Sequence, residues 1–287
     1  MKIRDRYYMY YSGRDSATMT WKVCLAISPD GKTSWSKQGP VLTPSHFHSV
    51  GFTGITEVSQ PWIIYTGGVY YMYVMAAGGS YDYTIFVATS SDGLSWNVPP
   101  APTNPLLSSY SGTMEARVWS PCVVFFGGQW YMYYLATDYR VSPPIVRIML
   151  ATANHPLGPW TKLGTIVMEG AAGEWDPGRL LGMGVILIDG NILFMAYAGE
   201  IRQPAYGYPI GSTLIGFAFS MDGTTFYRSL YNPIFLRAAE YERKVLRDPC
   251  LMYEGGKVRL WYGSEGGLGI SRIVYAEAIP SSTDVRQ

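Results

Sequence analysis

An internal repeat places the strongest constraint on the fold of this chain. A short aromatic segment recurs five times along the 287 residues, and its aligned second residues are Tyr8, Tyr71, Tyr131, Leu193 and Arg259. The intervals between these positions are 63, 60, 62 and 66 residues. Helical solenoids have shorter units of roughly 33 to 47 residues and a helical spacing of apolar residues. The repeat therefore favours a unit built from several strands.

Two further markers accompany the aromatic segment. A small-residue segment follows it and ends in an Asp-Gly pair in three units, at Asp30-Gly31, Asp92-Gly93 and Asp222-Gly223. Asp-Gly between strand-forming runs predicts a tight turn, because glycine accepts a positive φ without a Cβ clash. A proline precedes the aligned aromatic position by ten residues in three units, at Pro61, Pro121 and Pro249, and Met183 takes this place in the fourth.

Each unit consequently predicts four strands: an inner apolar strand, the aromatic strand, the small-residue strand and an outer strand after the turn. Four strands repeated five times indicate an all-β, five-bladed β-propeller with four-stranded antiparallel blades. We expect one propeller domain over residues 1–287, with blades at about 1–45, 46–108, 109–169, 170–237 and 238–287. The first blade lacks its innermost strand, because the aligned proline position falls before Met1. A partner chain that completes this blade is one expectation.

Composition limits the classes of function. The chain has 22 Lys and Arg against 21 Asp and Glu, so a net charge of +1 gives no electrostatic reason to expect binding to nucleic acid or a membrane. Three cysteines, Cys24, Cys122 and Cys250, lie in apolar runs and are expected as buried free thiols. His46 and His48 are expected in a surface loop, and no metal or cofactor is expected. The first residues do not resemble a secretory signal, which favours a cytoplasmic or particle-associated protein.

Acidic residues recur just before the inner strands, where propellers carry their functional groups. The candidate catalytic carboxylates are Glu57, Glu115, Asp176 and Asp248. Glycoside hydrolysis needs two carboxyl groups, one that protonates the leaving oxygen and one that activates water or attacks the sugar. The alternative for each is a structural role, such as a hydrogen bond to backbone amides or a solvated loop position.

Basic and aromatic residues accompany these acids. Arg117, Arg179 and Arg247 either neutralise the acids or bind a sugar hydroxyl or carboxylate in a bidentate manner. Trp62, Trp119 and Trp175 either stack on sugar rings or pack between the strands. The sequence leaves both alternatives open for each group.

At this level of detail the chain resembles the five-bladed β-propeller glycoside hydrolases, which include the arabinanase and xylosidase families and the invertase and levansucrase families. The Tyr-Tyr-Met-Tyr segments, His155–Trp160, Glu174–Gly178 and Arg247-Asp248-Pro249 carry this resemblance over nearly the whole chain. The resemblance implies three carboxylates: a base or nucleophile Asp, a stabilising Asp and a general-acid Glu. By motif, Asp176 corresponds to the base or nucleophile and Asp248 to the stabilising Asp. By linear order, Glu57 lies near the position of the stabilising Asp and Glu115 near that of the general acid.

Two functions follow as expectations. The first is a glycoside hydrolase-like propeller that acts on or binds an oligosaccharide or polysaccharide in its central funnel through these carboxylates. The second is a non-catalytic carbohydrate- or protein-binding module, such as a surface or virion component. The fold alone does not separate them, since propellers carry many functions.

Overall fold

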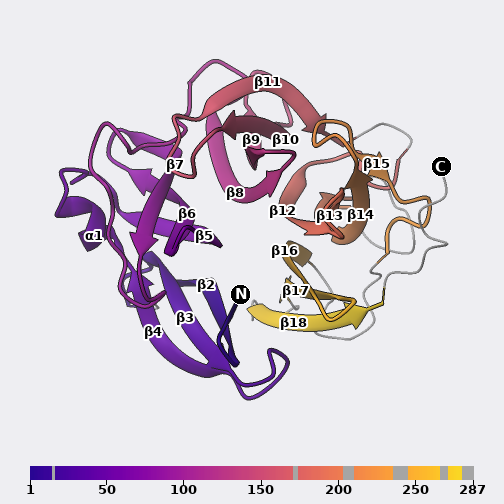
Figure 1. The fold of residues 1–287 in the computed structure, drawn as a ribbon. Coiled ribbons are helices and arrows are strands. Elements are labelled where there is room, and N and C mark those ends of the chain that lie inside the picture. The colour runs from indigo at the N-terminus through magenta and orange to yellow at the C-terminus, as the bar shows by residue number, and fades with distance from the viewer. Residues whose placement is uncertain (15–16, 171–173, 203–209, 235–244, 266–270, 280–287) are drawn as a thin grey trace. The chain divides into compact units, whose positions relative to one another are not determined.

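The computed structural model describes residues 1–14, 17–170, 174–202, 210–234, 245–265 and 271–279 of the chain (Figure 1). Strands are the main secondary structure of these residues, and the helix among them is the short α1 (Pro44–His48). His46 and His48 lie in this helix and not in the loop that the sequence predicted. No helix among these residues has the length and apolar character needed to cross a membrane.

The strands form four sheets. The first contains β1 (Lys2–Ile3), β2 (Arg6–Arg14), β3 (Trp21–Ser28) and β4 (Ser36–Leu42), in this order. The second contains β5 (Glu57–Thr66), β6 (Val69–Gly78) and β7 (Tyr81–Ser90). The third contains β8 (Arg117–Phe126), β9 (Gln129–Asp138), β10 (Ile145–Ala153) and β11 (Thr161–Met168). The fourth has seven strands: β12 (Leu180–Ile188), β13 (Ile192–Glu200), β14 (Thr213–Ser220), β15 (Tyr227–Arg228), β16 (Val245–Glu254), β17 (Lys257–Glu265) and β18 (Ser271–Ala278).

The all-β class and the four-stranded antiparallel sheets are thus confirmed, and the number of blades stays a prediction. In the seven-stranded sheet, two groups meet through a parallel pairing of Thr213 with Val245. The hydroxyl group of Thr213 strengthens this junction by donating a hydrogen bond to Leu246 O at 2.7 Å. Within each of the two groups, the described strands pair in antiparallel fashion.

The sequence predicted no innermost strand in the first sheet, and the structure has only the two-residue β1 at this edge. β1 has two residues, and it pairs with β2 through Lys2 and Ile3 alone. The corresponding strands β5 and β16 each have ten residues. β1 therefore pairs with only a short part of the β2 edge.

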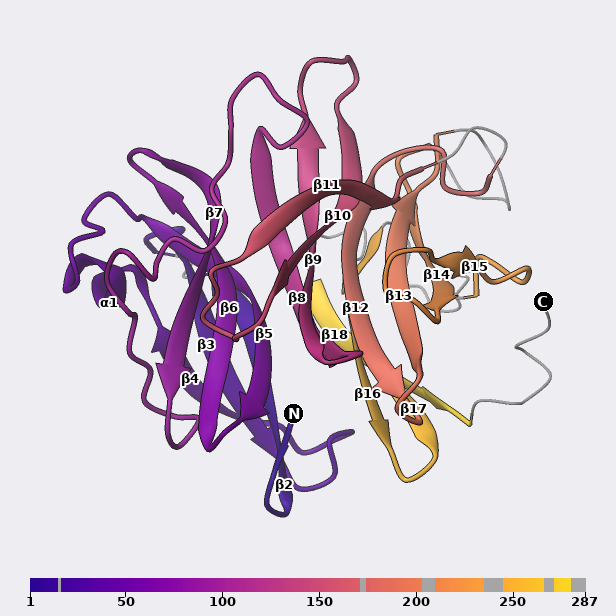
Figure 2. The same ribbon diagram turned by 45° about the horizontal axis from the view of Figure 1, so that its top comes forward.

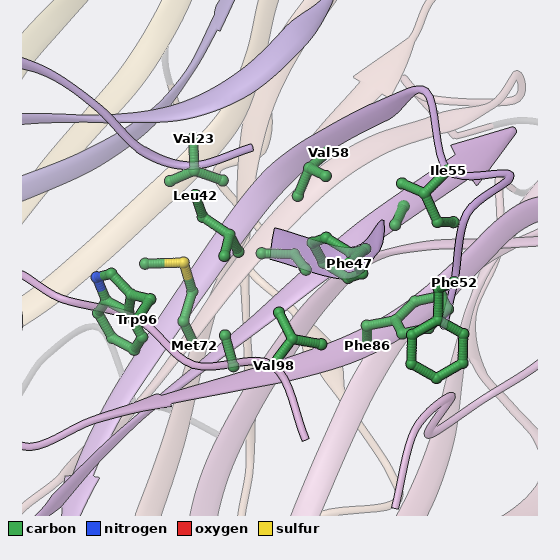
Figure 3. Close-up of a cluster of buried hydrophobic side chains, with 13 residues drawn as sticks. Val23, Leu42, Phe47, Phe52, Ile55, Val58, Met72, Phe86, Trp96 and Val98 are labelled. Carbon is green, nitrogen blue, oxygen red and sulfur yellow. The ribbon is translucent and has the colours of Figure 1, made fainter. Parts of the chain in front are cut away.

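The chain divides into two compact units. Unit 1 comprises Met1–Phe125, Gln129–Arg140 and Ala151–Leu163, and unit 2 comprises Phe126–Gly128, Val141–Leu150 and Gly164–Gln287. The core of unit 1 joins the first two sheets: Val23 and Leu42 pack with Phe47 of α1 and with Phe86 of β7 (Figure 3). The rings of Phe47 and Phe86 meet edge to face at a centroid distance of 5.3 Å. Apolar side chains from both sheets therefore fill the space between them.

Unit 2 contains a separate core. Ile188, Ala196 and Ile215 pack against Leu246 and Leu260, so side chains from both strand groups of the seven-stranded sheet contribute. β12 and β13 lie side by side in both views (Figure 2). This core supports the strands on which the candidate residues of unit 2 lie.

The predicted Asp-Gly turns share one hydrogen-bond pattern. In the turn after β7, Ser90 Oγ donates to Asp92 Oδ1 at 2.9 Å and accepts from Gly93 N at 2.9 Å. The same contacts recur at Ser28 and at Ser220. Gly93 has φ +75°, which confirms the reason for glycine in this position.

The cysteines follow the prediction in part. Cys122 is buried, Cys24 is half-buried and Cys250 is exposed. The prediction of a buried thiol is therefore wrong for Cys250. Gly184 of β12 lies close to this residue and has no side chain to cover it: a Cβ atom there would lie 3.2 Å from Cys250 Cα.

The hydrogen bond that the serine accepts in the Asp-Gly turn can be tested by mutation. Substituting Ser90→Ala leaves the amide of Gly93 buried without its acceptor, so we expect the free energy of unfolding to fall by about 1–3 kcal/mol. Ser91→Ala is the matched control, since Ser91 is exposed in the same turn and should change stability by less than about 0.5 kcal/mol. Urea denaturation of both variants measures the difference. Equal effects would show that the buried hydroxyl does not hold the turn.

Candidate functional site

A backbone irregularity recurs at the marker position of the inner strands. Gln60, Ser120 and Asp248 each precede the marker proline and have φ values of +56°, +52° and +50°. Gly182 holds the same place before Met183, with φ +101°. The strand pairing shifts register at this point in β5, β12 and β16. A left-handed conformation is unfavourable for residues with a side chain, and such strained positions concentrate at functional sites.

These bulges contact one another within each unit. In unit 1, Ser120 N donates to Gln60 Oε1 at 3.0 Å. In unit 2, a Cβ atom on Gly182 would lie 2.7 Å from both the Cα and the Oδ1 of Asp248. Glycine at position 182 thus leaves room for the carboxyl group of Asp248. Of the four bulge residues, Asp248 is the one with an acidic side chain.

The surroundings of Asp248 combine crowding with access to water. Desolvation by neighbouring protein raises the pKa of Asp248 to about 6, and the guanidinium of Arg247 opposes this rise. The side chain is nevertheless 48% exposed. This carboxyl group is therefore reachable from solvent, and its environment favours the protonated form more than water does.

Arg247 links two carboxylates. Its Nε lies 3.9 Å from Asp248 Oδ2, and its Nη2 lies 3.6 Å from Glu265 Oε2. Glu265 ends β17, and Gly263 beside it leaves space along which the Arg247 side chain extends. Asp248 and Glu265 thus share one guanidinium.

A second arginine–glutamate pair occurs in the neighbouring strand group of unit 2. Arg179 Nε donates to Glu200 Oε2 at 2.9 Å, and Arg202 Nη2 lies 4.0 Å from the same oxygen. Glu200 ends β13 as Glu265 ends β17. Arg179, which the sequence predicted to bind substrate, therefore forms an ion pair with Glu200.

Asp176 is held in a different environment. Its side chain is completely buried, and Oδ1 accepts from Arg228 Nη1 at 2.8 Å. The other carboxylate oxygen is buried with no hydrogen-bond partner among the described residues. Desolvation raises the pKa of Asp176 to about 6 even though Arg228 lowers it. The adjacent Trp175 is buried too, against Gly199 and the ring of Tyr197, so it packs inside the protein.

Glu115 has an equivalent arrangement in unit 1. It accepts a hydrogen bond from Tyr134 and lies 2.8 Å from Lys162 Nζ. The cation also lies over the tyrosine ring, 5.9 Å from its centroid, as Arg228 lies 5.8 Å from the centroid of Tyr197. In both cases an acid before the inner strand, a tyrosine of the second strand and a cation of the outer strand form a cluster. We call this arrangement the acid–tyrosine–cation clasp.

The remaining predicted residues lie in unit 1. Glu57 is the first residue of β5, and Arg117 is the first residue of β8. Both lie near Tyr83. Desolvation and then the charge of Glu57 raise the pKa of Tyr83, and the charge of Arg117 lowers it. The indole N–H of Trp62 donates to Val123 O at 2.8 Å, and that of Trp119 donates to Thr137 Oγ1 at 3.1 Å. These hydrogen bonds within the unit favour packing roles for both tryptophans.

The sequence analysis singled out Asp248 and Arg247 as candidates but not Glu265, which contacts the same guanidinium. One signal was available: acids stand seven, seven and six residues after the aligned aromatic positions of the last three repeats, at Asp138, Glu200 and Glu265. Lys162 and Arg228 gave no signal, because they come from outer strands whose sequences do not repeat. Among the described residues, no group of three or more His, Cys, Asp and Glu side chains is arranged to hold a metal ion.

Comparison with known proteins agrees with the fold and names a family. The family model "Glycosyl hydrolases family 43" matches residues 53–275. Solved structures that resemble the chain include a thermostable family-43 glycoside hydrolase, with a TM-score of 0.73, 16% identity and coverage of 100% of this chain and 93% of that one. A glycosyl hydrolase from Bacteroides ovatus has a TM-score of 0.72 and 18% identity, with coverage of 97% of this chain and 82% of that one.

A third similar structure extends the likeness to another family. The Bombyx mori GH32 beta-fructofuranosidase BmSUC1 has a TM-score of 0.68 and 15% identity, and the match covers 93% of this chain and 54% of that one. No curated protein matches the sequence. The shared fold of these structures is the β-propeller of this group of glycoside hydrolases, which confirms the predicted propeller class and the family resemblance.

The buried carboxyl group of Asp176 predicts a pH dependence of stability. Its pKa is about 6 when folded and near the ordinary 3.8 when unfolded, so the folded state binds the proton more tightly. Its favourable contribution is complete below about pH 4 and is lost as the pH rises through 6. Relative to Asp176→Asn, we expect the wild type to gain about 2–3 kcal/mol of unfolding free energy between pH 7 and pH 4.

Asp222→Asn is the control for this measurement. Backbone amides of Thr225 and Thr224 lower the pKa of Asp222, so its contribution changes only below the ordinary pKa. Denaturation curves from pH 4 to pH 7 should show no drift for this variant relative to the wild type. A flat difference for Asp176→Asn over the same range would contradict the raised pKa.

Proposed function

Because the chain belongs to the glycosyl hydrolases of family 43, we propose that it hydrolyses a glycosidic bond with Asp248 as the proton donor. The observation that carries this proposal is a half-exposed carboxyl group in a strained bulge, with a raised pKa. A general acid works best when its pKa lies close to the working pH, and a carboxyl group reaches this range through desolvation. The substrate of this activity is an oligosaccharide or polysaccharide.

Glu265 is the second carboxylate in this proposal. It contacts the same guanidinium as Asp248, and both acids lie within 4 Å of Arg247. Asp248 gives its proton to the glycosidic oxygen as the bond from that oxygen to the anomeric carbon breaks. Water attacks the anomeric carbon and gives a proton to Glu265, which yields a hemiacetal and an alcohol. The negative charge moves from Glu265 to Asp248 in this reaction, and Arg247 contacts both carboxyl groups.

Asp176 and Glu115, two of the catalytic candidates from sequence, receive structural roles here. Each forms part of an acid–tyrosine–cation clasp, and Asp176 has no surface that a sugar reaches. In both clasps the carboxylate is paired with a cation from another strand, and removing the cation would leave a buried charge. The two acids are therefore engaged within the protein and are not placed to transfer a proton to a substrate.

These same clasps favour a second candidate, a carbohydrate-binding module without turnover. The family resemblance matched Asp176 to a catalytic role by motif and Glu115 by linear order. Both acids are paired with cations. A chain that retains the propeller and the exposed rim of Asp248, Arg247 and Glu265 can bind sugar hydroxyl groups without cleaving a bond. Turnover separates the two candidates.

The activity is tested with a panel of 4-nitrophenyl glycosides, including arabinofuranoside, xyloside and mannoside. We expect Asp248→Asn to lower kcat/KM by at least about 100-fold, since loss of a general acid typically costs 10²–10⁴. Asp189→Asn is the matched control, an acid in the turn between β12 and β13 that also has a positive φ. Activity that survives Asp248→Asn would remove Asp248 from the reaction.

The exposed thiol of Cys250 reports on binding independently of turnover. It lies two residues after Asp248 on β16, so a sugar bound at that carboxyl group should slow its alkylation by iodoacetamide. Peptide mass spectrometry separates this thiol from the buried Cys122. Protection without release of 4-nitrophenol would identify the binding module, and absence of both would defeat the two candidates together.

The protonated form of Asp248 also predicts the alkaline limb of the pH profile. Because its pKa is about 6, kcat/KM should fall about tenfold per pH unit well above that value. The profile is measured from pH 4 to pH 9 on the best substrate of the panel. A rate that stays constant to pH 8 would rule out Asp248 as the proton donor.

A further inference from the structure

Unit 1 carries an exposed cluster of aromatic and charged side chains that the proposed reaction does not use. Arg117 begins β8, and its guanidinium carbon lies 4.5 Å from the ring centroid of Tyr83 and 5.3 Å from that of Tyr139. Arg117 Nη1 donates to Tyr139 Oη at 2.8 Å. Its Nε lies 3.1 Å from Asp82 Oδ1. We call these four residues, with Glu57, the Tyr83–Tyr139 cluster.

The cluster is open to solvent. The side chain of Asp82 is 62% exposed, and Tyr139 is 49% exposed. Tyr83 is half-buried, so Tyr139 is the more exposed of the two rings. Arg117 contacts both rings and restricts their orientation, which gives a surface of aromatic and planar cationic groups.

The backbone beneath the cluster is tightly fixed. Tyr83 has φ +49°, an unfavourable conformation for an aromatic residue. The hairpin that precedes Asp82 packs on the segment that leads to Glu57: a Cβ atom on Gly78 would lie 2.5 Å from both Gly54 O and Thr56 Oγ1. Thr56 N also donates to Ala77 O at 2.8 Å. Two strand ends are thereby locked together, and a preorganised surface of this kind is typical of a binding site.

The charges of the cluster indicate the class of ligand. Two carboxylates, Asp82 and Glu57, accompany the one guanidinium, and both raise the pKa of Tyr83. This balance disfavours an anionic ligand and supplies acceptors for hydroxyl groups. Aromatic rings stack on the apolar faces of a sugar, while a carboxylate and a guanidinium bind neighbouring hydroxyls with directional hydrogen bonds.

We propose that the Tyr83–Tyr139 cluster is a binding subsite for a neutral sugar residue of an oligosaccharide. Tyr139 provides the exposed face on which the sugar ring stacks. Asp82 accepts hydrogen bonds from hydroxyl groups, and Arg117 donates to their oxygens through the edge of its guanidinium. The inference rests on the proposed carbohydrate function but requires no turnover by Asp248.

The test uses the Asp248→Asn protein, so that hydrolysis does not disturb binding. Isothermal titration with linear arabino-, xylo- and manno-oligosaccharides gives the Kd of the best ligand. Tyr139→Ala should weaken this Kd roughly five- to tenfold through loss of stacking. Arg117→Lys keeps the charge but loses the planar donor edge, and it should weaken binding by at least about fivefold.

Tyr65→Ala is the matched control, because Tyr65 is a similarly exposed tyrosine near the other end of β5. Its Kd should stay within about twofold of the parent, since it makes no contact with the cluster. An unchanged Kd for Tyr139→Ala, an equal loss for Tyr65→Ala, or tighter binding of a uronate-substituted oligosaccharide would each overturn the subsite. Failure of 4-nitrophenyl glycoside turnover in the wild type would defeat only the catalytic role of Asp248, since the binding data are independent of it.

Discussion

The bulge in the inner strands is the constraint from which the arrangement of candidate groups follows. A strand that keeps its regular pleat alternates side chains between two faces, and no residue turns toward the neighbouring inner strand. The left-handed residue before each marker proline breaks this alternation. The left-handed residue then contacts the left-handed residue of another inner strand in the same unit. Ser120 contacts Gln60 in this way, and Gly182 contacts Asp248. The strain at this point is balanced by the long ladders on both sides of it.

Glycine occupies only one of the four bulges. Gln60, Ser120 and Asp248 carry side chains and precede proline, which disfavours their left-handed conformation further, so the strand pairing on both sides holds them in it. The fourth repeat has Met183 in place of proline, and there Gly182 adopts the conformation without a steric cost. Loss of the Cβ atom also creates the space that the Asp248 carboxyl group fills. One substitution in the repeat thus serves the backbone and the acid together.

Much of the fold was predictable from sequence because local rules repeat along the chain. The Asp-Gly turns and the aromatic strands depend on residues close together in sequence, such as Ser90 and Gly93. The site was less predictable because its partners come from other strands. Nothing near Asp176 in sequence indicates that Arg228 neutralises it, and nothing near Arg117 indicates Tyr83 or Tyr139.

Acids near the start of the inner strands can therefore serve opposite purposes, and burial decides between them. Asp176 and Glu115 precede their inner strands by a similar distance and end in clasps, where a cation from the outer strand offsets their charge. Asp248 lies within the strand, where the bulge turns it toward water and the nearest guanidinium is shared with Glu265. A shared cation neutralises neither acid completely. Proton exchange with a bound molecule requires a carboxyl group that is both reachable and incompletely paired, and in unit 2 the rim of Asp248, Arg247 and Glu265 meets both conditions.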